Sequence, residues 1–129
     1  MDALLARLDA RGLDHATHWA LAVTGAELCA PGHPSVFGEA TVAGCCAVVS
    51  TARLGAGTAT LHRRLLTEAV HELGHVAGLE HCAATTCVMY PSLDIADTDR
   101  KGSHFCKRCR EALSHALPHA SLDPARACD

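Results

Sequence analysis

Aromatic side chains, long apolar runs and clustered basic residues are all scarce in this sequence of 129 residues. Aromatics make up 3% of the chain, so a core must be built mainly from leucine, valine and alanine. No stretch approaches the ~18 consecutive apolar residues of a membrane-spanning helix. The formal net charge is −3, whereas a nucleic-acid-binding protein needs a clustered basic surface to neutralise phosphates. These absences argue against nucleic acid and membranes as partners.

A recognisable export signal is also lacking. Residues 1–13 read MDALLARLDARGL, in which charges interrupt the apolar positions, whereas a signal peptide has an unbroken apolar core. The eight cysteines are then better explained as metal ligands than as disulfides, because cytosolic thiols are kept reduced. We therefore expect a cytoplasmic protein.

The length suits a single domain, for which the sequence predicts three strands and three helices. The strands are expected at residues 18–24, 36–42 and 45–51, and the helices at 2–11, 60–77 and 107–117. Residues 29–34 contain two prolines and a glycine and are predicted to be a loop. Residues 82–106 are predicted to be irregular.

The helix expected at residues 60–77 has apolar residues at every third or fourth position, which predicts a core-facing stripe. Thr58 or Thr60 is expected to cap its start, and Gly78 to end it in a left-handed conformation. The stripe consists of Leu61, Leu65, Ala69, Leu73 and Val76, and is widened by Leu66 and Val70.

This helix also carries the sequence HELGH, followed by Gly78 and His81. Residues i and i+4 lie on the same face of a helix, so His71 and His75 can bind one zinc ion. A turn at Gly78 lets His81 supply a third ligand, which leaves a fourth position for water, as in catalytic zinc sites. Glu72 can then take the proton from that water as general base. A lone HExxH can arise by chance, but the longer pattern HExxHxxGxxH is seldom found without a zinc site.

Four cysteines form two closely spaced pairs beyond this motif: Cys82, Cys87, Cys106 and Cys109. Four thiolates can enclose one zinc tetrahedrally and leave no open position, so we predict a structural zinc site. The alternative is that these cysteines are buried thiols that pack as small apolar groups.

The other four cysteines show no such pairing. Cys45 and Cys46 lie in an apolar segment and are expected in the core. Cys29 and Cys128 have no assigned role.

Together, the two constellations resemble the archaemetzincin family of the metzincin metallopeptidases. The family joins its long zinc motif directly to a Cys₄ site, here in HELGHVAGLEHC, then CVM, then FCKRC. The likeness extends upstream through VFGEA and AVVST and covers roughly residues 23–109. By resemblance, His71, His75 and His81 bind the catalytic zinc, the four paired cysteines bind a second zinc, and Met89 forms the methionine turn beneath the catalytic zinc.

The resemblance implies an α+β fold with a mixed, twisted sheet and backing helices. It further implies one peptidase domain over residues 1–129, with the active-site helix at about 60–77 and a small Cys₄ subdomain at about 82–117. Family members begin with a strand before the first helix. We therefore expect this first sheet strand to be missing here, through a misplaced start codon or a trimmed form.

The function implied by the resemblance is hydrolysis of peptide bonds in peptides or small proteins, and some members act like aminopeptidases. The alternative is a zinc-stabilised interaction module whose histidine site is catalytically idle. Glu72 favours the peptidase, because an idle site needs no carboxylate beside an open zinc position.

Overall fold

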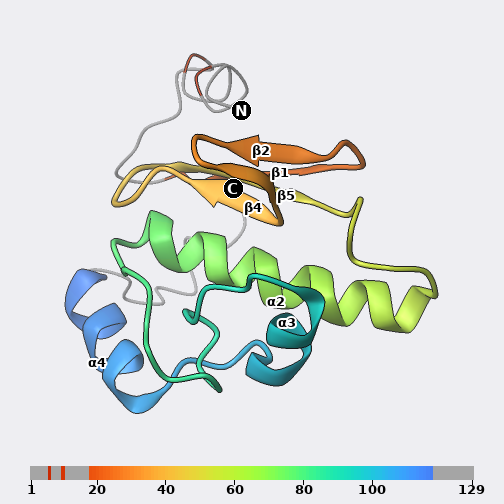
Figure 1. Cartoon of the computed structure of the whole chain (residues 1–129). Helices are drawn as coiled ribbons and strands as arrows, with labels where there is room; N and C mark the ends of the chain where they lie inside the picture. Colours follow the sequence, from red (N-terminus) through yellow and green to blue (C-terminus); the bar gives the residue numbers. More distant parts are fainter. Residues whose placement is uncertain (1–5, 7–9, 11–17, 118–129) are drawn as a thin grey trace, which may run out of the picture.

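A three-stranded sheet forms the upper layer of the computed structural model, which describes residues 6, 10 and 18–117 (Figure 1). Its strand order is β1 (Ala20–Thr24), β5 (Cys46–Ser50), β4 (Gly38–Ala40). β1 runs parallel to β5, and β4 runs antiparallel to it. Every residue of β5 is buried, as expected for the central strand. The predicted strands at 18–24, 36–42 and 45–51 are confirmed within shorter bounds.

The predicted loop at residues 29–34 was wrong. This segment belongs to an antiparallel hairpin of β2 (Leu28–Ala30) and β3 (His33–Val36). Pro31 and Gly32 make only its turn, where Gly32 has a φ of 77°. The pairing is irregular between Leu28 and Ala30, and a two-stranded ribbon of this kind tolerates a proline such as Pro34. Leu28 packs against the sheet with Cys45, Cys46 and Val48.

Helix α2 (Thr58–Val76) lies beneath the sheet, between it and the C-terminal helices (Figure 1). The predicted helix is confirmed, but its threonine cap is not, because Gly57 occupies the N-cap position without a side-chain hydrogen bond. Gly78 has a φ of 100° just after the helix, as predicted.

The apolar stripe predicted on α2 is not its most buried face. The buried residues include Thr67, Glu68, His71 and Glu72, whereas Leu66 is 55% exposed. Of the five stripe residues only Val76 is buried, whereas Leu61, Leu65, Ala69 and Leu73 are half-buried. The helix therefore buries the side that carries the polar motif.

The region predicted to be irregular at residues 82–106 contains helix α3 (Ile95–Lys101). The Asp94 side chain caps this helix by accepting a hydrogen bond from the Asp97 backbone N–H at 3.0 Å. Helix α4 (Lys107–Ala116) follows close to its predicted bounds. Most of the predicted helix at residues 2–11, and the question of a strand before it, lie outside the described residues. The two residues described there are joined by a hydrogen bond from the Ala10 backbone N–H to the Ala6 carbonyl at 3.0 Å.

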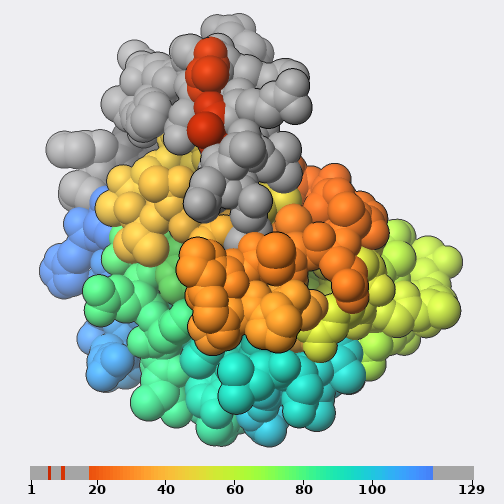
Figure 2. All heavy atoms as spheres, turned by 45° about the horizontal axis from the view of Figure 1, so that its top comes forward, coloured from red at the N-terminus to blue at the C-terminus, as the bar shows by residue number. Residues whose placement is uncertain are grey.

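Segments far apart in the sequence meet on one face of the molecule. In Figure 2 the orange residues of the hairpin lie against the teal residues around α3. Between them opens a cavity lined by residues 33–40 on one side and by α2 and residues 91–93 on the other. Within residues 18–117, no helix is long and apolar enough to cross a membrane.

Candidate active site

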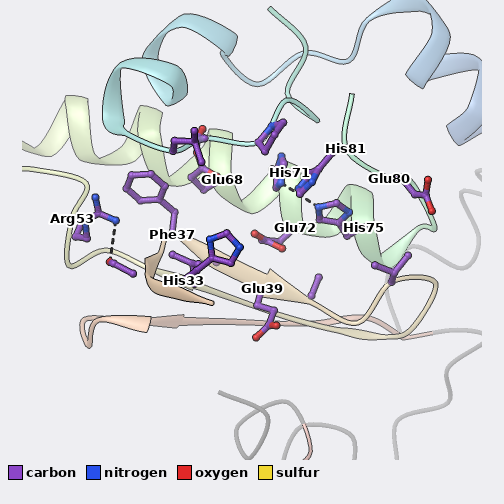
Figure 3. Close-up of a pocket in the computed structure, with 18 of the residues that line it drawn as sticks. His33, Phe37, Glu39, Arg53, Glu68, His71, Glu72, His75, Glu80 and His81 are labelled. Atoms are coloured by element: carbon purple, nitrogen blue, oxygen red, sulfur yellow. Dashed lines mark hydrogen bonds between the residues drawn. The ribbon is translucent and has the colours of Figure 1, made fainter. Parts of the chain in front are cut away.

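Three histidines meet beside this cavity (Figure 3). His71 and His75 lie one turn apart on α2, and His81 returns to them after the turn at Gly78. Their candidate ligand atoms all lie within 4.8 Å of one another. The predicted histidine cluster is therefore assembled as the motif requires.

Backbone carbonyls hold two of these rings in one tautomer. The Nδ1 atom of His71 lies 2.7 Å from the carbonyl oxygen of Val88, and that of His75 lies 2.7 Å from the carbonyl oxygen of Leu79. A carbonyl oxygen only accepts, so each Nδ1 carries the hydrogen. In the neutral rings, both Nε2 atoms then present lone pairs, and these atoms are 3.2 Å apart. Two facing lone pairs repel each other unless a cation lies between them.

The three imidazoles are held in the neutral form that binds metal. Burial lowers the pKa of His71 to about 3, and the charge of Lys101 lowers it further. Burial is also the main cause that lowers the pKa values of His75 and His81. These rings therefore need no deprotonation to accept a cation at neutral pH.

Glu72 is buried on α2 and points toward the cavity (Figure 3). Burial raises its pKa to about 8, and the neighbouring charge of Glu68 adds to the rise, while Lys101 opposes it. A divalent cation at the histidines would favour the ionised carboxylate. The pair of features, neutral imidazoles and a carboxyl that is costly to ionise, suits a cation site.

Met89 lies against α2 at Gly74, the residue before His75. Its side chain is fully buried, and a Cβ added to Gly74 would collide with its sulfur. Gly74 thus permits the close approach of the Met89 side chain to the helix. The role of Met89 as the turn methionine stays a prediction.

The cavity itself has a volume of about 1010 Å³. This volume is at the upper end of the range for small-molecule pockets and can admit several residues of a peptide. β4, at the end of the three-stranded sheet, contributes one wall. Among the described residues no strand pairs with its outer edge, which suits backbone hydrogen bonds to an extended chain.

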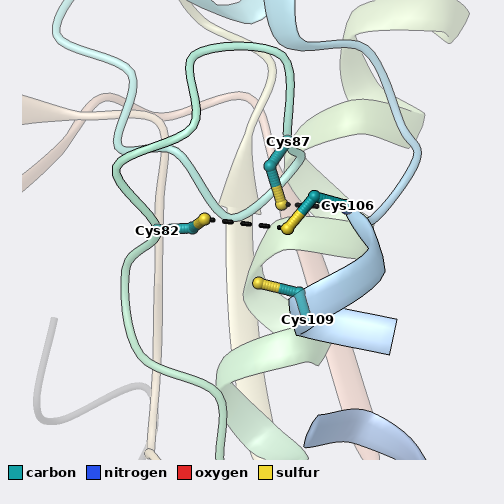
Figure 4. Close-up of side chains that lie close together, drawn as sticks. All are labelled: Cys82, Cys87, Cys106 and Cys109. Atoms are coloured by element: carbon teal, nitrogen blue, oxygen red, sulfur yellow. Dashed lines mark hydrogen bonds between the residues drawn. The ribbon is translucent and has the colours of Figure 1, made fainter. Parts of the chain in front are cut away.

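The two predicted cysteine pairs also converge (Figure 4). The Sγ atoms of Cys82 and Cys106 are 3.9 Å apart, and the Cys87 sulfur accepts the Cys106 backbone N–H at 3.3 Å. The backbone N–H of Cys109, at the start of α4, is the main cause that lowers the pKa of Cys106 to about 7. Burial raises the pKa of Cys109. The four sulfurs all lie within 4.8 Å of one another and together offer a donor set that suits a structural zinc ion.

Of the other cysteines, Cys45 and Cys46 are buried, as predicted, and Cys29 is exposed. Cys128 lies outside the described residues.

An ion pair beneath the histidines was not predicted. The Lys101 ammonium lies 3.4 Å from a Glu68 carboxylate oxygen, and their side chains are 0% and 3% exposed. Lys101 also donates to the Tyr90 carbonyl at 2.9 Å, and Glu68 accepts from the hydroxyls of Thr98 and Ser92. Burial lowers the pKa of Lys101, whereas Glu68 opposes that shift.

This network joins α2, α3 and the segment after Met89. Sequence spacing holds no signal for it, because its charged members are 33 residues apart on different elements.

The chain is similar to a known peptidase family over most of its length. The profile of peptidase family M54 matches residues 15–115. The archaemetzincin of Archaeoglobus fulgidus is 45% identical over 96 residues, which cover 74% of this chain and 59% of that protein. The archaemetzincin of Methanopyrus kandleri is 43% identical over 108 residues, which cover 83% of this chain and 62% of that protein.

Solved structures agree. The crystal structure of the M. kandleri archaemetzincin matches with a TM-score of 0.82 at 42% identity, over 91% of this chain and 64% of that one. The crystal structure of a zinc-dependent peptidase from Methanocorpusculum labreanum matches with a TM-score of 0.78 at 31% identity, over 84% of this chain and 71% of that one. The α+β fold predicted from the sequence is thereby confirmed.

The chain spans about six tenths of the length of the archaemetzincins of A. fulgidus and M. kandleri. The residues 15–115 that match the family include both clusters of candidate metal ligands. The resemblance drawn from the sequence is confirmed, and the chain belongs to peptidase family M54.

Proposed function

We propose that this protein is a zinc-dependent metallopeptidase that hydrolyses peptide bonds, with His71, His75 and His81 as zinc ligands and Glu72 as general base. The observation that carries the proposal is the pair of facing Nε2 atoms, 3.2 Å apart, beside a buried carboxyl in a peptide-sized cavity. Membership of family M54 supports the same function.

The donor atoms fit zinc. Three neutral imidazole nitrogens are a usual catalytic zinc set, and the carbonyl partners of His71 and His75 orient their rings as supporting groups do in such sites. When bound, zinc would polarise the scissile carbonyl and make an attacking water more acidic.

Residues of the protein transfer the proton and hold the substrate. Glu72 accepts a proton from the attacking water and passes it to the leaving amine, a role worth ~10²–10⁴-fold in rate. The edge of β4 holds the substrate backbone in an extended conformation. The wall formed by residues 91–93 closes the opposite side of the cavity.

The proposal includes a second zinc ion per chain, bound by Cys82, Cys87, Cys106 and Cys109. Four converging sulfurs leave no open ligand position, so this ion would be structural. We propose that the chain acts as a single peptidase domain with residues 82–117 as its zinc-stabilised subdomain.

Substrates would be peptides or small proteins. Glu80, an exposed carboxylate that lines the cavity beside His81, could bind a substrate α-ammonium, which favours aminopeptidase-like cleavage. The cytoplasmic location and the absence of nucleic-acid and membrane partners stay predictions from the sequence.

Hydrolysis of a quenched fluorescent peptide library by the zinc-loaded protein tests the proposal. Glu72→Gln should lower the rate by ~10²–10⁴ while zinc content stays unchanged, because the carboxylate is not a ligand. Glu27→Gln, an exposed carboxylate outside the cavity, is the matched control and should cleave normally. Undiminished cleavage by Glu72→Gln would reject the mechanism. No cleavage by the unmodified protein would favour the idle interaction module.

A further inference from the structure

The charged residues that line the cavity are mostly acidic, and a single arginine lies among them. Among the described residues that line it, Arg53 is the only arginine or lysine, whereas the carboxyl groups are those of Glu39, Glu68, Glu72 and Glu80. Figure 3 shows Arg53 and Glu80 at opposite ends, with the histidines nearer Glu80. The cavity therefore has a guanidinium at one end and the Glu80 carboxylate at the other.

Neutral groups hold the Arg53 side chain in place. Its Nη1 donates to the Ser35 hydroxyl at 2.9 Å, and its guanidinium carbon lies 4.8 Å from the centre of the Phe37 ring. Both partners belong to the wall that precedes β4. The contacts fix the guanidinium at the cavity without neutralising its charge.

Three other arginines among the described residues are paired with acids. Arg63 and Arg64 contact Asp99, and Arg100 contacts Asp97. Within residues 18–117, no carboxylate lies within ion-pair distance of Arg53. A guanidinium has five N–H donors in a planar fork that matches a carboxylate, and the Ser35 contact occupies only one of its nitrogens.

We infer that Arg53 selects the substrate by binding a carboxylate, supplied by a free C-terminus or by an acidic side chain. This inference rests on the proposed peptidase function and names a substrate class for it. Glu80 at the other end favours the positively charged N-terminal end of a peptide, so the carboxylate lies on the C-terminal side of the cleaved bond. The site thereby prefers short peptides with a free C-terminus or peptides with an acidic residue after the cleavage point.

Peptide binding to the zinc-loaded Glu72→Gln protein tests the inference without requiring hydrolysis. Three fluorescent alanine–leucine peptides are compared by anisotropy: one amidated at its C-terminus, one with a free C-terminus, and one amidated with an aspartate near that end. At least one of the two carboxylate peptides should bind about 10-fold more tightly than the neutral peptide, as expected for a charge-assisted contact. The arm that gains affinity identifies the source of the carboxylate.

Substitutions at Arg53, added to the same background, identify the partner. Arg53→Ala should remove the preference and leave binding of the neutral peptide unchanged, whereas Arg53→Lys should keep part of it, since the charge remains but the fork is lost. Arg63→Ala, an exposed arginine outside the cavity, is the matched control and should keep the whole preference. Melting temperatures of all variants show whether they are folded, and Arg53→Lys provides a second test if Arg53→Ala is not.

Equal affinity for all three peptides, or a preference that survives Arg53→Ala, would overturn the inference. Hydrolysis of the same peptides by the protein with Glu72 intact separates this result from the proposed function. Cleavage without carboxylate preference refutes only the role of Arg53, whereas carboxylate preference without cleavage refutes only the peptidase.

Discussion

At the scale of single residues, a base and an acid that both resist becoming charged are neighbours in the site. Burial opposes both protonation of the His71 imidazole and ionisation of the Glu72 carboxyl. A divalent cation can bind the free imidazole lone pairs, and its charge offsets the cost of ionising the Glu72 carboxyl. Metal binding and the ionisation of the general base are therefore coupled.

The pH dependence of stability follows from the Glu72 pKa. Its pKa is about 8 in the folded protein against an ordinary value of 4.5, so folding takes up a proton between these pH values. The contribution of Glu72 to the free energy of unfolding therefore falls as pH rises through this window, by up to ~1.4 kcal/mol per pH unit. Glutamine does not titrate, so Glu72→Gln should gain stability relative to the unmodified protein between pH 5 and pH 7.5.

Thermal unfolding of the unmodified protein and of Glu72→Gln is measured at pH 5 and pH 7.5, after a chelator has removed the metal from the histidines. The histidines titrate alike in the two proteins, so their effect cancels in the comparison. Saturating zinc should reduce the pH-dependent difference in stability between the two proteins, because a cation favours the ionised Glu72 carboxylate. A stability difference that does not change with pH would contradict the assigned environment of Glu72.

At the scale of secondary-structure elements, α2 and α3 are joined by the buried pair of Glu68 and Lys101. Its third link is the carbonyl of Tyr90, in the segment that follows Met89. The segment also supplies the Val88 carbonyl that orients His71. The position of that ring thus depends on contacts among α2, α3 and this segment.

Lys101→Met should destabilise the zinc-loaded protein by about 3–5 kcal/mol, because it leaves the Glu68 charge buried without its partner. Adding Glu68→Gln should restore part of that loss. Lys107→Met is the matched control: Lys107 pairs with Glu111 at 3.9 Å but is 84% exposed, so its loss should cost less than ~1 kcal/mol. Chemical denaturation measures all three variants. Equal costs at Lys101 and Lys107 would show that the buried pair does not stabilise the packing of α2 on α3.

Elements with strong periodicity were predictable, and those defined by tertiary contacts were not. The spacing of His71, His75 and Gly78 specifies a local geometry, so the sequence predicted the cluster and the turn after α2. Helix α3 was missed because its seven residues include a single large apolar side chain, Ile95, and its signal lies in the Asp94 cap. The β2–β3 hairpin was missed because Pro31 suggested a loop.

The same limit applies within the site. The side of α2 that carries His71 and Glu72 is buried by β4, β5 and the segment around Val88, which come from distant parts of the chain. Periodicity alone therefore placed the leucine stripe in the core. Arg53 and Ser35 meet across 18 residues, and only the fold brings them together.

At the scale of the whole molecule, the two clusters of candidate metal ligands share one stretch of chain. His81 is bonded directly to Cys82, and the Cys82 backbone N–H donates to the Met89 carbonyl at 3.0 Å. Val88, whose carbonyl holds His71, follows Cys87. The cysteine cluster thus anchors the floor of the histidine site, and we expect the structural ion to persist when the catalytic ion is removed.

Zinc content per chain, measured together with peptide hydrolysis, tests most directly whether the protein is a peptidase that depends on zinc at its three histidines. We expect two zinc ions, of which a chelator removes one easily, because four thiolates bind zinc more tightly than three imidazoles. Hydrolysis should vanish with that ion and return when about one equivalent of zinc is added back. Hydrolysis that persists after the histidine-bound ion has been removed would contradict the account, as would a single zinc that survives substitution of all four paired cysteines.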